Sequence, residues 1–415
     1  MTQQRDKIRN FLLTILKNQM GLSYKEVFSS LTTQECHKLI DTSRKHHISP
    51  LLYQYLKTIE SQVPPEILQT FRTDYFQNAI RNLELYRNLA DVLKSLHQAH
   101  IPIIPFKGLF LAEHVYKNIA ARSMSDVDLL VKREELDRAR DILLKFGFNP
   151  MSGLDQIAPK EYQLSFYHSK SNLILELHWL IINPKHRVHL NTAALWERSL
   201  PSQISGVPVR ILTAEDQILQ LCMHASDHVF GHGLRAMVDI KKTLLHYDKE
   251  IDWTLLSQRA LEWGVTRSLF VNLWLAKKLL NAPVPDLWLN SNKVETITQN
   301  RLEFSEECLF MNAEEPETAL PETDNLILLW KEESFLKKIV LIWNAFFPSR
   351  LYLSVRYPIP PNSWRIYLYY PIRIKDLLRK RAGTLWALIR GDKSTVQHAE
   401  VQNELLLLKN WLFSA

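Results

Sequence analysis

The sequence predicts an α+β fold in which a small mixed β-sheet is embedded between helical N- and C-terminal regions. Apolar residues recur at helical spacing over much of residues 1–100 and again from residue 213 to about residue 300. Between these regions, residues 101–212 contain several short apolar segments that are separated by turn residues. A hydrophobic content of 46% with 23% charged residues is typical of a globular chain and argues against general disorder.

The length of 415 residues exceeds what one hydrophobic core usually supports and favours several domains. We expect a helical N-terminal region over residues 1–100, a core that carries the sheet over residues 101–212, and a helical region that closes a cleft over residues 213–302. An acidic linker and a basic, aromatic C-terminal region are expected over residues 303–415.

A long helix is predicted to begin at Pro64-Pro65, because proline is favoured in the first turn of a helix. Apolar residues at steps of mostly three or four then predict one stripe that packs against the rest of the protein: Phe76, Ile80, Leu83, Leu89, Leu93 and Leu96.

The core is predicted to contain a strand over 101–106, a helix over 109–116, a strand over 122–131, a helix over 134–146 ended by Gly147, a hairpin of strands 162–169 and 173–181, and a strand over 206–212. Pro102 and Pro105 place the first strand at a sheet edge, because proline cannot donate to a hydrogen-bond ladder. Thr213 and Asp216 predict a variant of the capping box at the start of the following helix.

Asp126 and Asp128 are the most informative residues of the chain. Because they are separated by one residue and followed by an apolar run, both carboxylates are expected on one face of a strand. Clustered carboxylate oxygens together with substrate phosphates are the ligands by which proteins hold Mg²⁺ with a nucleoside triphosphate. The pair therefore indicates phosphoryl or nucleotidyl transfer, provided that a phosphate cradle and a third acid are present.

Glu176 is a candidate for the third acid, because a lone carboxylate among the apolar residues of a core strand is costly unless it is paired or binds a cation. If its strand lies beside the strand of Asp126, the three acids converge and could bridge two metal ions about 3.5–4 Å apart. A salt bridge to a lysine or arginine is the alternative. Lys107 and Gly108, at a strand-to-helix turn, could supply the phosphate cradle.

Two segments, 106–116 and 122–131, resemble the bacterial uncharacterised nucleotidyltransferases of the polymerase-beta-type superfamily. A more distant resemblance links them to the nucleotidyltransferase toxins of the abortive-infection type. Residues 46–53, 221–224 and 235–239 also fit the family pattern, so that the resemblance extends over about residues 1–260.

The resemblance implies an enzyme that uses Mg²⁺ or Mn²⁺ and a nucleoside triphosphate such as ATP. A cytoplasmic location is expected because the three cysteines, Cys36, Cys222 and Cys308, are far apart and have no pairing pattern, which suits a reducing cytosol. It implies that Asp126, Asp128 and Glu176 are the metal-binding and catalytic acids. Four further residues would then surround the triphosphate: Lys107, Gly108, Arg122 and Ser125. In one departure from the superfamily, Gly108 is followed by Leu109 instead of by glycine or serine, so that the triphosphate must be held differently.

Several other residues are candidates for the acceptor side. His224 and His228 have the i, i+4 spacing of metal ligands, but no glutamate follows the first histidine as in a zinc protease helix. Arg235 and Asp239, also four apart, are most simply an ion pair on one helix face. His178 could assist an acceptor hydroxyl, or it could be a hydrogen-bonded core histidine.

The acceptor itself is not indicated by the sequence, and a small molecule, a peptide and RNA are all compatible with it. Basic and aromatic residues are interleaved in 340–393 and could grip nucleic acid, a membrane surface or a protein surface. The alternatives are therefore a toxin-like RNA or tRNA nucleotidyltransferase, a transferase acting on a peptide or small molecule, and a non-catalytic binding protein. Residues 303–333 are acidic and predict a surface loop or domain junction, and no segment has the length and composition of a transmembrane helix.

Overall fold

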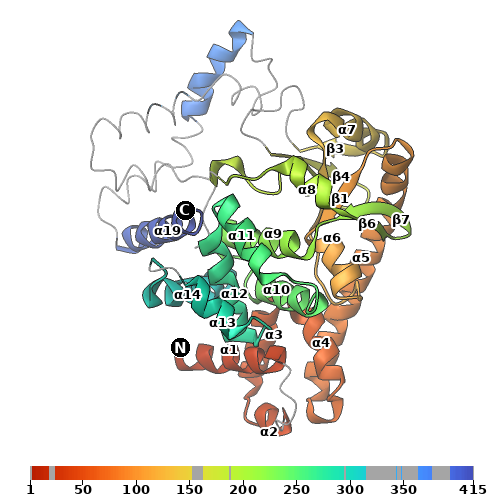
Figure 1. Ribbon diagram of the computed structural model, residues 1–415. Helices are drawn as coiled ribbons and strands as arrows, with labels where there is room; N and C mark the ends of the chain where they lie inside the picture. The colour runs from red at the N-terminus through yellow and green to blue at the C-terminus, as the bar shows by residue number, and fades with distance from the viewer. Residues whose placement is uncertain are drawn as a thin grey trace.

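The computed structural model describes residues 2–17, 24–151, 162–186, 188–293, 296–314, 343, 347, 363–375 and 393–414. It confirms the α+β fold, with a mixed sheet against one side of a large helical body (Figure 1). None of the helices in these residues is long and apolar enough to cross a membrane. The domain boundaries of the preceding section stay a prediction, and the segment 340–393 lies largely outside the described residues.

The main sheet has the strand order β1-β2-β5-β4-β3. Its strands are β1 (Ile103–Phe106), β2 (Asp126–Val131), β3 (Phe148–Pro150), β4 (Gln163–His168) and β5 (Leu173–His178). The central pair β2 and β5 is parallel, and the other pairs are antiparallel. The predicted edge position of the first strand and the predicted hairpin 162–181 are both confirmed. A separate two-stranded sheet contains β6 (Leu200–Ile204) and β7 (Val207–Ile211).

Two hydrophobic cores lie on opposite faces of the main sheet. Val127 and Leu129 of β2 pack, with Leu175 and Leu177 of β5, against α5 (Pro65–Gln98) and α7 (Leu136–Lys145). Leu130 belongs instead to the core of the helical body. Because Asp126 and Asp128 alternate with Val127 and Leu129, the two acids lie on the sheet face directed at the helical body.

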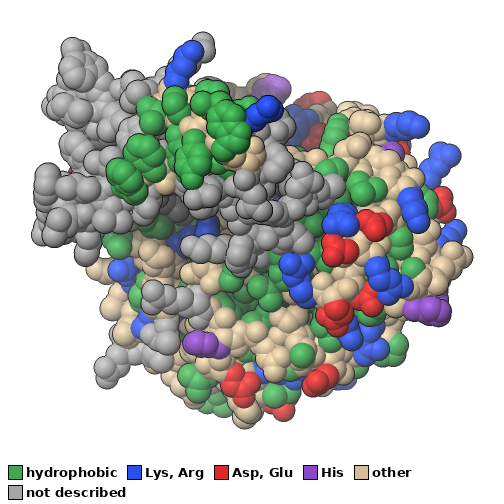
Figure 2. Space-filling view, turned by 90° about the horizontal axis from the view of Figure 1, so that it is seen from above, with side chains coloured by type: hydrophobic (Ala, Val, Ile, Leu, Met, Phe, Trp, Pro, Cys, Tyr) green, Lys and Arg blue, Asp and Glu red, His purple; other side chains and the backbone are tan. Residues whose placement is uncertain are grey.

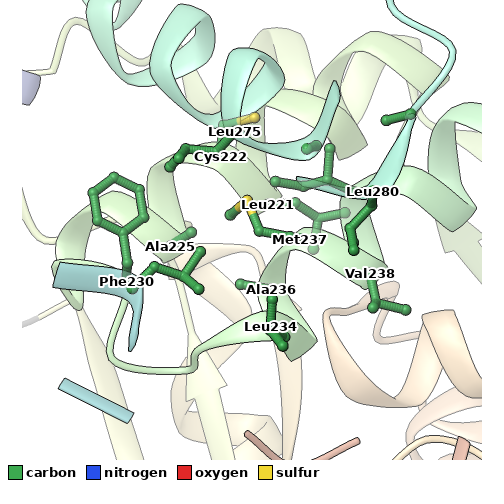
Figure 3. Close-up of a cluster of buried hydrophobic side chains, with 14 of the residues drawn as sticks. Leu221, Cys222, Ala225, Phe230, Leu234, Ala236, Met237, Val238, Leu275 and Leu280 are labelled. Atoms are coloured by element: carbon green, nitrogen blue, oxygen red, sulfur yellow. The ribbon is translucent and has the colours of Figure 1, made fainter. Parts of the chain in front are cut away.

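The helical body is built from elements that are far apart in the sequence. Its helices are α1 (Thr2–Lys17), α2 (Tyr24–Ser29), α3 (Thr33–Lys45), α4 (Ser49–Lys57), α8 (Thr192–Arg198), α9 (Ala214–Asp227), α10 (Leu234–His246), α11 (Trp253–Trp263), α12 (Thr266–Leu280), α13 (Asp286–Asn292), α14 (Gln299–Glu314) and α19 (Lys393–Leu412). Figure 3 shows the contact between α9, α10 and α12, which bury Leu221, Cys222, Met237, Leu275 and Leu280. This packing fixes the orientation of α9 and α10 toward the sheet.

The long helix α5 begins at Pro65 as predicted, but half of its predicted apolar stripe is exposed. Leu89, Leu93 and Leu96 are buried, whereas Phe76, Ile80 and Leu83 are 50%, 59% and 57% exposed. The buried face of the middle turns is formed by Asn78 and Asn82 instead. These asparagines donate hydrogen bonds to backbone carbonyls of residues 119–122. Because these hydrogen bonds are satisfied, polar residues can form the buried face in the middle turns of the helix.

Of three other local predictions, two were wrong and one was confirmed with a different helix type. Thr213 lies at the N-cap of α9 but makes no side-chain cap, and Asp216 binds Arg198 and Arg259 instead. The acidic stretch that was predicted as a loop begins, in its described part, as the helix α14, which extends to Glu314. The predicted helix 109–116 is the single turn α6 (Gly108–Phe110) followed by a π-helical turn, Leu111–Val115.

The surface near α7 carries charges of both signs. Figure 2 shows acidic and basic side chains interspersed there, and Arg140 pairs with Asp137 and Asp141.

Substitution of one leucine on each half of the α5 stripe should give unequal losses of stability. Leu93→Ala removes a buried side chain and should lower the free energy of unfolding by about 2–5 kcal/mol. The matched control Leu83→Ala removes an exposed side chain and should change it by no more than about 0.5 kcal/mol. Urea denaturation followed by tryptophan fluorescence measures both, and equal losses would contradict the observed orientation of the helix.

Candidate active site

The parallel pairing of β2 with β5 brings the predicted acids together. Asp128 lies directly opposite Glu176 in the register of the two strands, and Asp126 is opposite Ile174. Paired residues on neighbouring strands point to the same face of a sheet, so Asp126, Asp128 and Glu176 share one face. These side chains line a cavity of about 220 Å³ between the sheet and the helical body, together with His224, His228, His232 and Arg235.

Asp128 is a buried carboxylate with two close partners. Lys107 Nζ lies 2.7 Å and His178 Nε2 lies 2.9 Å from Asp128 Oδ1. Burial alone would raise the pKa of Asp128, but the Lys107 ammonium and the hydrogen bond from His178 outweigh burial and hold the pKa below its usual range. Asp128 is therefore ionised at neutral pH.

Glu176 and His178 form the second part of the site on β5. His178 Nε2 also lies 3.2 Å from Glu176 Oε2, and Ser165 Oγ donates to Glu176 Oε1 at 2.9 Å. Burial opposes ionisation of Glu176, but the hydrogen bond from His178 prevails and lowers its pKa. His178 is buried and orients two carboxylates at once, which gives it a positioning role. The expected salt bridge from a lysine or arginine to Glu176 is absent from the described residues.

Asp126 differs from Asp128 because no lysine, arginine or histidine in the described residues pairs with it. It is half-buried and accepts a hydrogen bond from Ser125 Oγ at 3.1 Å. Burial and the nearby Asp128 raise the pKa of Asp126. Both effects are relieved when a cation binds, so this carboxylate is the one that gains most from a metal ion.

The donor set fits a hard divalent cation. Ligand atoms of Asp128, Glu176 and His178 lie within 4.8 Å of one another, and Asp126 adjoins this group without belonging to it. Carboxylate oxygens suit Mg²⁺ and Mn²⁺. His178 Nε2 contacts both acids, so it serves as their hydrogen-bond donor, and the three acids remain as the ligands that fit such an ion.

Lys107 and Gly108 connect β1 to α6 through an unusual backbone. Lys107 has φ +52° and ψ −124°, a conformation that costs about 1–3 kcal/mol for a residue with a side chain. From this position its side chain forms the ion pair with Asp128. Gly108 is required for close packing, because a Cβ at this position would lie 3.0 Å from Arg122 Nη1 and 3.1 Å from Met124 Cγ. Its role as a phosphate cradle stays a prediction.

Arg122 lines the cavity and forms an ion pair, and its place beside the triphosphate stays a prediction. It is buried, and its Nε and Nη2 donate to the two carboxylate oxygens of Asp239 at 3.1 and 2.8 Å. Tyr116 Oη donates to Asp239 Oδ1 at 2.7 Å. Asp239 thus pairs with Arg122 of the sheet core, and the predicted ion pair between Arg235 and Asp239 was wrong.

His224, His228 and His232, here called the histidine cluster, face the acids across the cavity. Their ring centroids are 4.5–4.8 Å apart. His232 was not predicted from the sequence, although it follows His228 by four residues as His228 follows His224. It lies beyond the end of α9, where helical spacing no longer predicts which side chains meet. Val229 and Phe230, both buried at φ +44° and +61°, and Gly233 at φ +58° fold the loop back so that His232 meets the other two rings. The spacing and the pattern Gly231-His232-Gly233 were the available signals.

A larger cavity of about 700 Å³ lies beyond the C-terminal ends of β2 and β5. Arg133 stacks over Trp179 at 4.6 Å, and Lys132 lies 5.9 Å from the Trp196 ring centroid. In the part of the chain that the structure describes, no group of metal-ligating side chains lines this cavity. The three predicted acids line the smaller cavity instead.

The chain belongs to the uncharacterised nucleotidyltransferase family, whose model matches residues 32–281 and thus includes the acids and the histidine cluster. The solution structure of the antibiotic-resistance factor ANT(2'')-Ia is a structural match, with 14% identity and a TM-score of 0.31, covering 46% of this chain and 96% of that chain. Comparison with curated proteins gave no match. The protein is accordingly an enzyme of the nucleotidyltransferase class.

Removing the Asp239 carboxylate should strongly destabilise the fold, because Arg122 would stay buried without its ion-pair partner. Asp239→Asn should lower the free energy of unfolding by about 3–5 kcal/mol. The exposed pair Lys277–Asp286 provides a matched control, and Asp286→Asn should cost no more than about 1 kcal/mol. A loss from Asp239→Asn as small as that of the control in urea denaturation would show that Arg122 does not depend on this partner.

Asp227 should make stability depend on acid pH. Its carboxylate lies 2.7 Å from His186 Nε2 and 2.8 Å from Lys409 Nζ of α19, and these partners hold its pKa below the usual range despite burial. Because the pKa is lower in the folded state, this stabilisation is present above about pH 4 and is lost as the pH falls through the folded-state pKa. Asp227→Asn should therefore cost about 1–3 kcal/mol at pH 7, and the difference from wild type should shrink below about pH 4. Denaturation at several pH values measures it, and a difference that does not vary with pH would contradict this role.

Proposed function

We propose that the enzyme transfers a nucleoside monophosphate from a nucleoside triphosphate to a hydroxyl or phosphate oxygen of an acceptor, with release of pyrophosphate and with dependence on Mg²⁺ or Mn²⁺. Membership of the nucleotidyltransferase family supports the class of reaction. The observation that carries the metal dependence is the register of β2 and β5, which sets Asp128 opposite Glu176 with Asp126 on the same face.

In the proposed reaction, an acceptor oxygen attacks the α-phosphorus of the nucleoside triphosphate. A bond forms between this oxygen and the α-phosphorus, and the bond from the α-phosphorus to the α,β-bridging oxygen breaks. Pyrophosphate leaves with the electron pair. A hydroxyl acceptor gives its proton to Glu176, whose carboxylate is ionised and held by Ser165 and His178.

A divalent cation held by Asp126, Asp128 and Glu176 would neutralise the charge on the phosphates and orient the reacting oxygens. The chain's own residues prepare this site. His178 and Ser165 fix the carboxylates, and Lys107 keeps Asp128 ionised while the site is formed. Such fixed charges around a reacting phosphate account for most of the acceleration in this class of reaction.

The most direct experiment incubates the full chain with each labelled nucleoside triphosphate, with Mg²⁺ or Mn²⁺, and with pools of small molecules, peptides and RNA. Pyrophosphate release and transfer of label to an acceptor, or to the protein itself, are the expected results. Label transferred to RNA alone would identify the toxin-like alternative. Release of inorganic phosphate without transfer of the nucleoside monophosphate would contradict the proposal.

Asp126→Asn should abolish the metal-dependent transfer, because the amide cannot replace a carboxylate as a metal ligand. We expect a loss of at least about a hundredfold in rate, the scale seen when one electrostatic group is removed from a reacting centre. Asp126 has no ion-pair partner in the described residues, so the substitution should leave the unfolding midpoint near that of wild type. Asp141→Asn on α7 is the control on an exposed carboxylate. Full activity of Asp126→Asn would contradict the assignment of Asp126 as a metal ligand.

A further inference from the structure

The histidine cluster is not used by the proposed reaction, although it faces the acids across the same cavity. We propose that the histidine cluster and Arg235 form a subsite for phosphate oxygens, which takes either the phosphates of the nucleoside triphosphate or a phosphate group of the acceptor. The identity of the nucleotide rests on the proposed function, whereas binding of phosphate at this subsite does not.

The tautomer of His232 is the first argument. Arg235 Nη2 lies 3.1 Å from His232 Nδ1, and a guanidinium can only donate, so Nδ1 accepts and Nε2 carries the proton. His232 Nε2 is buried and has no hydrogen-bond partner in the described part of the protein. A protonated nitrogen cannot ligate a metal ion, but it can donate to an oxygen. The cavity therefore contains a buried donor for which a phosphate oxygen is a fitting acceptor.

The arrangement of the rings is the second argument. The His224 and His232 rings are stacked, with centroids 4.7 Å apart and an interplanar angle of 22°. One nitrogen of each of the three rings lies within 4.8 Å of the others, a spacing that would also suit a metal ion, and the proton on His232 Nε2 favours an oxygen ligand over a metal ion. Side by side, these rings present several nitrogens to an extended group such as a chain of phosphates.

The charge of the surroundings is the third argument. Arg235 is half-buried, and in the described ranges its side chain contacts only the Ser123 carbonyl, at 3.5 Å, and His232. No carboxylate of the described residues forms an ion pair with this guanidinium, although Asp239 and Asp126 act on it electrostatically. Asp227, an acid beside the cluster, is paired with His186 and Lys409. A cation would meet repulsion from Arg235 here, while an anion would neutralise it.

Binding of an anion should also be linked to protons. Burial, with Lys107 and the other histidines nearby, lowers the pKa values of His224 and His232 well below the usual value for histidine, and burial lowers that of His228. The other groups that face the cluster are Arg235, Asp227, His47 of the α3–α4 connection and Lys409 of α19. A bound phosphate favours the imidazolium form of His224 and His228, whereas His232 stays neutral because its Nδ1 accepts from Arg235. The complex therefore takes up protons, and the affinity should rise as the pH falls from 8 to 6.

The test is calorimetric titration of the full chain with inorganic tripolyphosphate in the presence of a chelator. Arg235→Gln and His232→Leu should each weaken binding by at least about tenfold, the effect of losing one charge-assisted hydrogen bond. His232→Gln places an amide N–H near the position of Nε2 and should keep the affinity within about threefold of wild type. Arg140→Gln on α7 is the control for loss of a surface charge, and unfolding midpoints establish that each variant is folded.

Equal affinities of wild type, Arg235→Gln and His232→Leu would overturn the proposal. So would stoichiometric binding of Zn²⁺ that is lost in His232→Leu while tripolyphosphate binding is unchanged. If His232→Leu fails to fold, the comparison of Arg235→Gln with Arg235→Lys, which keeps the charge, decides the question.

Two further measurements assign the source of the phosphate and separate this proposal from the proposed function. If the same variants weaken the binding of ATP, the subsite holds phosphates of the donor. If ATP binding is unchanged while binding of inorganic phosphate to the ATP-loaded protein is lost, the subsite belongs to the acceptor. Asp126→Asn should lose transfer yet retain tripolyphosphate binding, so a failure of transfer alone leaves the subsite standing.

Discussion

The interaction on which the rest of the site depends is the stabilisation of the buried Asp128 carboxylate. A charge removed from water is costly unless it is paired and hydrogen-bonded, and Asp128 has both an ammonium and an imidazole within 2.9 Å. Each partner is positioned by a further feature of the fold. Lys107 has a strained backbone conformation, and His178 lies on the adjacent parallel strand. The geometry of the strand-to-helix turn and the pairing of β2 with β5 are thus tied to one carboxylate.

A second buried charge pair joins the sheet to the helical body. Arg122 precedes β2, and Asp239 lies on α10, so their bidentate contact fixes the helix that carries Arg235 relative to the strand that carries the acids. The backbone of Arg122 is held in turn by Asn82 of α5 at 2.9 Å. Buried ion pairs add little net stability compared with apolar packing, but they tolerate few alternative arrangements. Here the pair fixes the position of one side of the cavity relative to the other.

The sequence was sufficient for the parts of the site that depend on local pattern. Period-two alternation placed Asp126 and Asp128 on one face, and the turn residues 170–172 predicted the hairpin that carries Glu176. The sequence was insufficient where the position of a side chain depends on a partner far away along the chain. Asp239 has a suitable partner four residues away in Arg235 but binds Arg122, and Asn78 and Asn82 are buried because backbone carbonyls 37–42 residues later need donors. His232 joins its cluster through two strained residues that only tertiary packing can hold.

The two sides of the cavity have opposite chemistry, and this has a physical consequence for what can bind between them. The sheet presents carboxylates, of which Asp126 has no paired cation, and the helices present Arg235, which has no paired carboxylate in the described residues. A ligand that is only cationic or only anionic satisfies one side and repels the other. A polyphosphate that carries a divalent cation satisfies both, since the cation meets the acids and the phosphate oxygens meet the arginine and the imidazole donors. In the proposed function, the separation of charge across the cavity would favour a metal–phosphate complex over either component alone.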